Sequence, residues 1–320
     1  MDYQIVLIAV IVSTVISAIL GPLLIPILQR LKFGQSIRVD GPQKHLQKAG
    51  TPTMGGVMII IALSITALQF ANNTITLFLL ALVTIGYGLI GFTDDYIKVV
   101  MKRNLGLTAK QKLVAQILLA TIFYWFLIQT NHDTAIYLPG TTIGFELGWI
   151  YLPFVVFIMI GTTNAVNLTD GLDGLLAGVS SIVFTVYALI AIYMSQFDVA
   201  IFSASVVGAC LGFLLYNAHP AKVFMGDTGS LALGGALVGI AILTKTELLL
   251  VIVGAIFVIE ALSVIIQVIF FKWKKIRIFK MSPIHHHFEL SGWSEWKVVI
   301  VFWSFTLITA LLGLVIQFKL

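Results

Sequence analysis

Long apolar stretches alternate with short polar loops along the whole chain. Several reach the roughly 20 residues that a helix needs to cross a bilayer core of about 30 Å. They lack the strict alternation of barrel strands, so helices are favoured. The pattern predicts an all-α polytopic membrane protein with about ten transmembrane helices. The expected spans are residues 5–27, 55–70, 75–92, 113–128, 150–165, 175–194, 199–216, 230–243, 248–271 and 298–318.

The composition strengthens this prediction, because hydrophobic residues make up 59% of the chain and charged residues only 10%. Ordinary soluble domains carry about 25% charged residues. The placement of the charges is more informative than their net value of +5. With these spans, all but two of the 19 lysines and arginines fall on one side of the membrane, and only Lys245 and Lys319 lie opposite.

This asymmetry predicts how the chain is oriented. Cytoplasmic loops are enriched in lysine and arginine, so the basic side is expected to be cytosolic and both termini extracytoplasmic. Most loops on the other side are too short to hold a site, so we expect a catalytic cleft on the cytosolic face. Residues 1–320 are expected to form one transmembrane enzyme domain. We expect no nucleic-acid partner, because the basic residues flank membrane spans.

Two adjacent carboxylates, Asp94 and Asp95, follow the third apolar stretch. A helix C-terminus carries partial negative charge, and neighbouring carboxylates repel each other, so this placement requires a compensating cation. One interpretation is a solvated helix end balanced by Lys98 and Lys102. The other is a functional acidic pair, which the position beside a membrane span favours.

The loop after the fifth span, residues 164–174, contains Asn167, Asp170 and Asp173 but no basic residue. If it is helical, Asp170 and Asp173 share one face. If it is a turn, its glycines let backbone amides approach a ligand closely. The alternative is that one aspartate only caps the N-terminus of the sixth span. Capping explains one acid and leaves the rest of the polar run unexplained.

The next loop on the same side contains Asn217, Phe224 and Asp227. An amide and an aromatic ring suit hydrogen bonding and stacking against a flat heterocycle such as a nucleobase. Asp227 or Thr228 could instead serve only as the N-cap of the eighth span. Three acidic loops on one face favour a shared site.

Three consecutive histidines, His285, His286 and His287, lie far from either terminus. Consecutive side chains point in different directions, so we do not expect all three to hold one metal. Contact with an anion, or proton transfer, suits them better. The alternative is a polar loop without a function.

Two weaker signals lie beside the second span and within the ninth. Residues 48–56 bring Lys48, Thr53 and several glycines to the start of a helix, which suits phosphate contact, although the order of a P-loop is missing. Proline and glycine are also ordinary signals of a helix start. In the ninth span, Glu260 and Gln267 share a helical face that we expect to point inward, with Glu260 in a structural role.

Together these motifs resemble those of the phospho-N-acetylmuramoyl-pentapeptide-transferases, bacterial translocases of the polyprenyl-phosphate N-acetylhexosamine-1-phosphate transferase superfamily. The histidine run distinguishes this branch from relatives that use other sugar nucleotides. The resemblance implies ten helices and a homodimer in the bacterial plasma membrane. It rests on five segments that span nearly the whole chain in order: residues 48–56, 91–95, 164–174, 220–230 and 283–289.

The resemblance also implies a reaction. Phospho-N-acetylmuramoyl-pentapeptide moves from UDP-MurNAc-pentapeptide to undecaprenyl phosphate, giving lipid I and UMP in peptidoglycan synthesis, with Mg²⁺ as cofactor. Asp227 is the implied magnesium ligand, and Asp94 or Asp95 is a candidate for a second. The implied catalytic residues are Asp94, Asp95, Asp227, His285, His286 and His287. The implied substrate-binding residues are Lys48, Thr53, Lys98, Asn167, Asp170, Gly171, Leu172, Asp173, Asn217, Phe224 and Gln267.

The residues suit this chemistry, because displacing UMP from a pyrophosphate requires neutralised oxygens and an aligned nucleophile. We expect Asp94 to deprotonate or orient the lipid phosphate, Asp95 to position a lysine or a metal, and His286 with its neighbours to contact phosphate. A covalent aspartyl-phosphate route stays open. The alternative function is a polytopic transporter for a nucleotide sugar or a cation. A transporter needs a site near the midplane, whereas these polar groups gather on one side.

Overall fold

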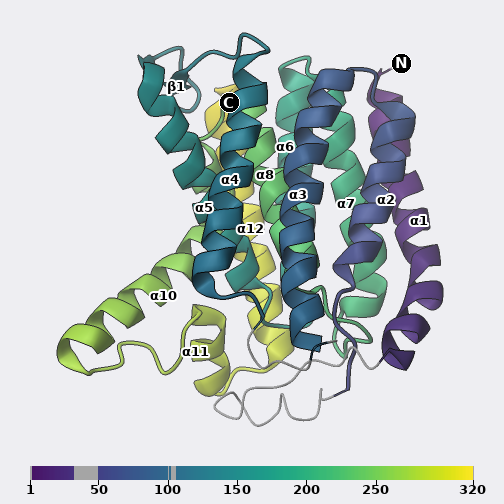
Figure 1. Cartoon of the computed structure of the whole chain (residues 1–320), viewed down its shortest axis with the longest axis vertical. Helices are drawn as coiled ribbons and strands as arrows, with labels where there is room; N and C mark the ends of the chain where they lie inside the picture. Colours follow the sequence, from purple (N-terminus) through teal and green to yellow (C-terminus); the bar gives the residue numbers. More distant parts are fainter. Residues whose placement is uncertain (1, 32–49, 100, 102–105, 320) are drawn as a thin grey trace.

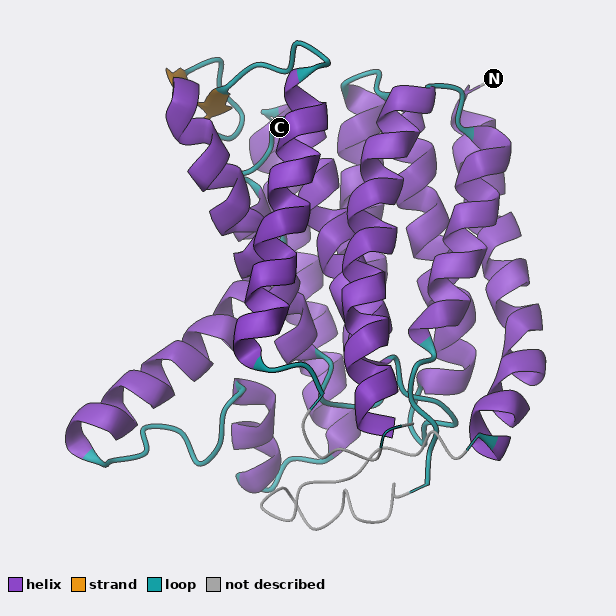
Figure 2. Ribbon diagram, in the orientation of Figure 1, coloured by secondary structure: helices purple, strands orange, loops and turns teal. Residues whose placement is uncertain are grey.

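The computed structural model describes residues 2–31, 50–99, 101 and 106–319. It is a bundle of helices with a small hairpin at one end, where both ends of the chain also lie (Figure 1). Helices dominate the described chain (Figure 2). The elements are α1 (Asp2–Arg30), α2 (Gly56–Phe70), α3 (Thr74–Val99), α4 (Ala109–Ile128), β1 (Ala135–Tyr137), β2 (Gly144–Glu146), the 3-10 helix η2 (Gly148–Ile150), α5 (Tyr151–Thr169), α6 (Leu175–Tyr193), α7 (Phe197–Asn217), α8 (Gly226–Leu243), α9 (Leu250–Val253), α10 (Ala255–Lys274), α11 (Ile284–Leu290) and α12 (Glu295–Phe318). The two strands are antiparallel, with Ile136 opposite Phe145.

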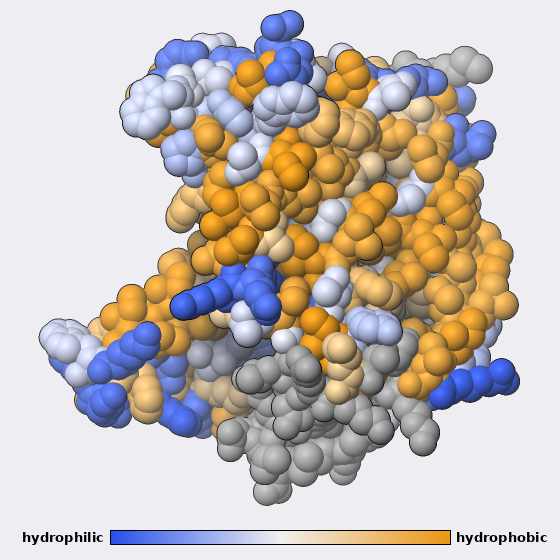
Figure 3. All heavy atoms as spheres, in the orientation of Figure 1, coloured by the Kyte–Doolittle hydropathy of each residue, from blue (hydrophilic) through white to orange (hydrophobic). Residues whose placement is uncertain are grey.

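Nine helices among the described residues are long and apolar enough to cross a membrane, and α2 is a shorter apolar helix of 15 residues. The predicted class of all-α polytopic membrane protein is therefore confirmed. The ninth expected span is not one helix, because Gly254 separates α9 from α10. On the face shown in Figure 3, hydrophobic residues cover the middle of the bundle. The cytosolic orientation stays a prediction.

Helices α6, α7 and α8 are the most buried of the membrane-crossing helices in the described chain. Helices in a membrane associate through close van der Waals contact, so small residues mark their interfaces. A Cβ atom at Gly208 of α7 would overlap the carbonyl oxygen of Val10 in α1. Large side chains such as Phe157, which is 74% exposed, face outward instead. Glycines therefore set how closely these helices approach.

Gly208→Ala should destabilise the protein, because the added methyl group must push α1 away from α7. Overpacking of this kind costs about 1–3 kcal/mol. Gly161→Ala is the matched control, since a Cβ at this helical position of α5 meets no atom within 4 Å. That change should leave stability unchanged or raise it by roughly 0.5–1 kcal/mol. Thermal unfolding in detergent measures both, and equal midpoints would contradict this packing.

At the hairpin end, a polar network joins the loop after α4 to α5 and to the loop after α8. The hydroxyl of Tyr151 donates to Glu247 Oε1 at 2.7 Å and lies 3.2 Å from His132 Nε2. The Lys245 ammonium donates to the carbonyl oxygen of Ala135 at 3.0 Å. Burial, and then the Lys245 charge, lower the pKa of His132 to about 4. His132 is therefore neutral in the folded protein near pH 7.

Acidification should weaken the fold through His132. The unfolded side chain takes up a proton near pH 6.5 and the folded one near pH 4, so the stabilisation is present above pH 6.5 and is lost as the pH falls. One proton contributes at most about 1.4 kcal/mol per pH unit, and partial exposure reduces this. Unfolding midpoints should show the advantage of the wild type over His132→Gln shrinking toward about pH 4.5. A constant difference would contradict this assignment.

Candidate active site

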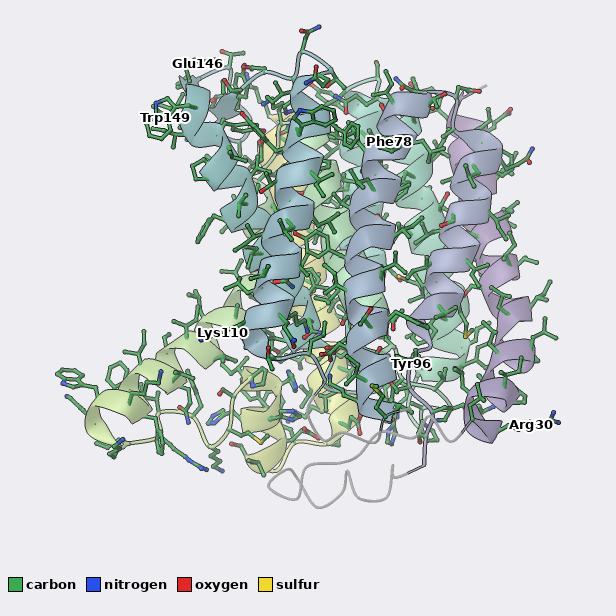
Figure 4. The ribbon with its side chains drawn as sticks, in the orientation of Figure 1. Arg30, Phe78, Tyr96, Lys110, Glu146 and Trp149 are labelled. Carbon is green, nitrogen blue, oxygen red and sulfur yellow. The ribbon has the colours of Figure 1, made fainter. Side chains whose placement is uncertain are left out.

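Acidic residues from separate motifs converge at the end of the bundle opposite the hairpin. Helix α3 extends beyond its predicted end, so Asp94 and Asp95 lie within the helix and not at its C-terminus. Helix α8 begins earlier than predicted and places Asp227 in its first turn, where a helix favours negative charge. Figure 4 shows Tyr96, the residue after Asp95, at this end of the bundle and Glu146 at the other.

Asp95 holds the first turn of α8. Its Oδ2 accepts hydrogen bonds from the amide and the hydroxyl of Thr228 at 2.9 and 2.7 Å, and its Oδ1 accepts from the amide of Asp227 at 3.2 Å. The first amides of a helix lack partners within the helix, so this carboxylate acts as a cap from a neighbouring helix. Gly91 permits the approach, because a Cβ there would overlap the carbonyl oxygen of Asp227. Asp95 thereby fixes where Asp227 lies.

Two lysines supply the cations that the acids require. Lys98 on α3 forms ion pairs with Asp94 and, at 3.3 Å, with Asp227. Lys112 on α4 lies 2.9 Å from Asp227 Oδ2. Asp94 Oδ1 also accepts a hydrogen bond from the amide of Leu107 at 2.7 Å. The acidic pair is therefore compensated by specific partners and is not a solvated helix end.

Asn167 completes the surroundings of Asp227. Its Nδ2 donates to Asp227 Oδ1 at 3.0 Å and to the hydroxyl oxygen of Ser230 at 2.7 Å. Asn167 belongs to the last turn of α5. Contacts from α3, α4 and α5 therefore all converge on this one carboxylate of α8.

The three carboxylates suit a divalent cation. One oxygen from each of Asp94, Asp95 and Asp227 can be chosen so that all three atoms lie within 4.8 Å of one another. Mg²⁺ prefers oxygen ligands and commonly uses one or two carboxylates together with substrate phosphates and water. Three carboxylates against the two ammonium groups of Lys98 and Lys112 leave net negative charge. The donor set therefore fits a hard divalent cation.

The loop between α5 and α6 is a turn, and its two aspartates face different partners. The Asp170 carboxyl accepts a hydrogen bond from the backbone of Gly226 at the start of α8. Burial, and then the charges of Asp227 and Asp95, raise its pKa to about 8. Asp173 is buried and lies 2.9 Å from His219 Nδ1. Of the two predicted arrangements, the turn is correct and the shared helical face is not.

Asn217 ties this turn to the loop after α7. Its side-chain oxygen accepts from the amide of Gly174 at 3.0 Å, and its Nδ2 donates to the carbonyl oxygen of Val223 at 2.9 Å. Phe224 follows and is half-buried, and its amide donates to the carbonyl oxygen of Pro52 at 2.8 Å. The amide group of Asn217 thus joins two loops. Substrate contact by Asn217 or Phe224 stays a prediction.

Other predicted substrate residues differ in their surroundings. Thr53 is 5% exposed and borders the cluster, since a Cβ at Gly226 would lie 2.7 Å from its hydroxyl and 2.6 Å from Asp95 Oδ2. Leu172 is buried in the hydrophobic core. Lys48 lies outside the described residues.

Gln267 holds the segment that follows α10. Its side-chain oxygen accepts from the amides of Ile278 and Phe279 at 3.1 and 3.0 Å. Its Nε2 donates to the carbonyl oxygen of Phe279 at 3.1 Å. These contacts order the chain that leads into α11, and a contact with substrate stays a prediction.

The three histidines lie on the short helix α11 and not in a loop. Each ring has a different partner. The partners are Glu260 for His285 at 3.0 Å, Glu289 for His286 at 2.8 Å, and the backbone amide of Lys280 for His287 at 3.1 Å. The rings therefore point toward different groups, as their consecutive positions predict.

Lys112 is the site residue that the sequence motifs did not single out. It lies in the first turn of α4, directly after a capping box made by Thr108 and Gln111. A lysine in the first turn of a helix opposes the helix dipole, so a negative partner is expected there. A Thr-x-x-Gln capping signature followed by lysine is therefore the signal from which its pairing with an acid could be predicted.

The fold and the cluster define a polytopic membrane protein of the glycosyl transferase class, and residues 77–245 match Glycosyl transferase family 4. Residues 48–60 match the phospho-N-acetylmuramoyl-pentapeptide-transferase signature 1. Phospho-N-acetylmuramoyl-pentapeptide-transferases of Bacillus velezensis and Bacillus subtilis are each 60% identical over 318 residues, 98% of either chain. That of Geobacillus thermodenitrificans is 56% identical over 321 residues, 99% of either chain. The chain belongs to the phospho-N-acetylmuramoyl-pentapeptide-transferase family.

Lys112→Gln should destabilise the protein, because the carboxylate of Asp227 loses its nearest ammonium group. Breaking a buried pair costs about 3–5 kcal/mol, and the 17% and 19% exposure of these side chains reduces the loss to roughly 1–3 kcal/mol. Lys110→Gln is the matched control, since Lys110 lies in the same turn and is exposed (Figure 4). Thermal unfolding compares the two, and equal losses would argue against the ion pair.

Proposed function

We propose that this protein transfers phospho-N-acetylmuramoyl-pentapeptide from UDP-MurNAc-pentapeptide to undecaprenyl phosphate, which forms lipid I and releases UMP. It acts in the bacterial plasma membrane with the acid cluster on the cytosolic face. The main support is the cluster of Asp94, Asp95 and Asp227 at one end of a membrane bundle. The chain is also 60% identical to a phospho-N-acetylmuramoyl-pentapeptide-transferase. The family resemblance alone supports a homodimer.

Asp227 is the proposed principal ligand of Mg²⁺, because contacts from three neighbouring helices hold its carboxylate. The ion, when bound, supplies positive charge to the pyrophosphate oxygens. Asp94 is the proposed second ligand or neighbour of that ion. Asp95 has a different role in this proposal, since α8 engages both of its oxygens and it therefore positions Asp227.

Lys98 and Lys112 are proposed to exchange carboxylate partners for phosphate oxygens when substrate binds. Both ammonium groups lie within 3.3 Å of Asp227 Oδ2, so they border the proposed phosphate position. Preorganised cations in a partly buried site stabilise the charge that develops on the departing UMP. The two lysines thus keep the cluster stable before binding and serve the reaction afterwards.

Asp94 is proposed to orient the phosphate of the lipid acceptor and to accept its proton. Its pairing with Lys98 puts an acid and a cation beside one another on α3, so both side chains can contact the same phosphate group. His286 and His287 are proposed to contact phosphate from α11. The nucleotide is assigned to the loops that carry Asp170, Asp173, Asn217 and Phe224.

The proposed route is direct displacement by the lipid phosphate. The Asp94 oxygens are engaged by Lys98 and by the amide of Leu107, which supports a proton-accepting or orienting role over that of a nucleophile. A single-turnover reaction with labelled nucleotide substrate and no lipid acceptor should leave no phospho-sugar on the denatured protein. A stoichiometric adduct would establish the covalent route instead.

A transporter is less well supported. Transport requires a site near the midplane that opens to both faces. Asp94, Asp95 and Asp227 cluster with Lys98 and Lys112 at the end opposite the hairpin, where Figure 4 labels Tyr96 and Lys110. Release of UMP by purified protein, dependent on both substrates, separates the two functions.

Asp227→Asn should lower the rate of UMP release by about 100-fold or more, because the amide keeps the shape of the side chain but loses its charge. Asp198→Asn is the control. Asp198 lies at the opposite end, where it accepts from the amides of Asn72 and Asn73 at 2.6 and 3.1 Å, and asparagine retains that acceptor. Near-normal turnover of Asp227→Asn at saturating Mg²⁺ would refute its role as a ligand.

A further inference from the structure

Glu260 is an ionisable residue inside a membrane-crossing helix that the proposed reaction does not use. It lies in α10 with 0% of its surface exposed. A buried carboxylate needs hydrogen-bond donors, and the start of α11 supplies one to each oxygen. The amide of Ile284 donates to Oε2 at 2.9 Å, and His285 Nδ1 lies 3.0 Å from Oε1. Glu260 therefore anchors the histidine helix to α10.

The opposite edge of the His285 ring lies against the turn between α5 and α6. A Cβ atom at Gly171 would overlap His285 Nε2, so this nitrogen faces the glycine directly. The ring is fully buried, and Nε2 has no hydrogen-bond partner among the described residues. A hydrogen on Nε2 would point into the glycine, whereas a bare lone pair fits. The packing therefore places the ring hydrogen on Nδ1, facing Glu260.

The backbone conformation at position 171 does not require a glycine. Its φ lies outside the left-handed region, in contrast to Gly174 with φ +76°. The imidazole of His285 is what excludes a larger residue there. The carboxyl of Asp170, the preceding residue, is hydrogen-bonded to the backbone of Gly226, directly before Asp227, so the placement of the turn also sets the placement of this carboxyl.

We propose that Glu260 and His285 form a buried strut that positions residues 170–171 beside the acid cluster, with His285 held as the Nδ1–H tautomer. The kinetic consequence rests on the proposed function; the packing and the tautomer do not. Both are positioning residues, because neither side chain is exposed. His285 therefore has a different role from His286 and His287, which are the two histidines proposed to contact phosphate.

A double-mutant cycle tests the strut through kcat for UMP release. Gly171→Ala and His285→Ala should each lower kcat by about 10–100-fold, as losses of supporting residues typically do. The added methyl group fits the space that the imidazole vacates, so the double variant should be no slower than Gly171→Ala alone. If the kcat loss of the double variant equals the product of the two single losses, the proposal is overturned. Gly161→Ala with His285→Ala is the control pair, and its losses should multiply, because a Cβ at Gly161 would meet no neighbouring element within 4 Å.

Nitrogen-15 spectra of histidine-labelled protein in detergent test the tautomer without turnover. The His285 signals, assigned by their loss in His285→Ala, should show a protonated Nδ1 and a bare Nε2. The groups that face this ring are Glu260 from α10, Gly171 from the turn and His286 from α11, whose ring centroid lies 4.1 Å away.

Glu260→Gln should shift the His285 Nδ1 signal, since the packing against Gly171 keeps the ring hydrogen on Nδ1. The glutamine amide offers one acceptor, which the Ile284 amide takes, and turns a donor toward His285 Nδ1. A wild-type Nε2–H tautomer, or a spectrum unchanged in Glu260→Gln, would overturn the strut. Wild-type protein that releases no UMP would refute the proposed function instead, and these spectra would still decide the strut.

Discussion

The site depends on the close approach of α3 to the first turn of α8. Gly91 permits it, because any side chain there would collide with the backbone of Asp227. Asp95 stabilises it by accepting hydrogen bonds from two amides and a hydroxyl of α8. Through that contact the first turn of α8 is capped by a residue of another helix. The carboxylate of Asp227 then lies beside the lysines of α3 and α4. The packing of α3 on α8 therefore determines the geometry of the acid cluster.

The charges at this centre explain why so polar a group is stable beside a membrane. Lys98 and Lys112 offset most of the negative charge of the three carboxylates, and Asn167 satisfies a further oxygen. In the proposed reaction the same ammonium groups serve the phosphates, and a bound cation takes their place against the acids. The lysines therefore link the stability of the folded protein to its chemistry.

Much of this arrangement could be predicted from the sequence. The apolar stretches indicate the spans, and acids in separate loops on one side indicate a shared site. What could not be predicted depends on contacts between distant segments. Asp95 acts as a cap only because α3 packs on α8, and Lys112 becomes a site residue only because α4 packs on α3, from where the lysine reaches Asp227. His285 is buried because Glu260, within an apolar helix, binds the start of α11.

Binding of Mn²⁺ to the purified protein, followed by loss of the free-ion electron paramagnetic resonance signal, tests whether Asp227 is the principal ligand of the divalent cation. The wild type should bind the ion, and Asp227→Asn should weaken binding by at least about 10-fold. Asp198→Asn should bind as the wild type does, because Asp198 lies at the opposite end of the bundle, where it accepts from the amides of Asn72 and Asn73. Unchanged Mn²⁺ binding in Asp227→Asn would show that this carboxylate does not hold the ion.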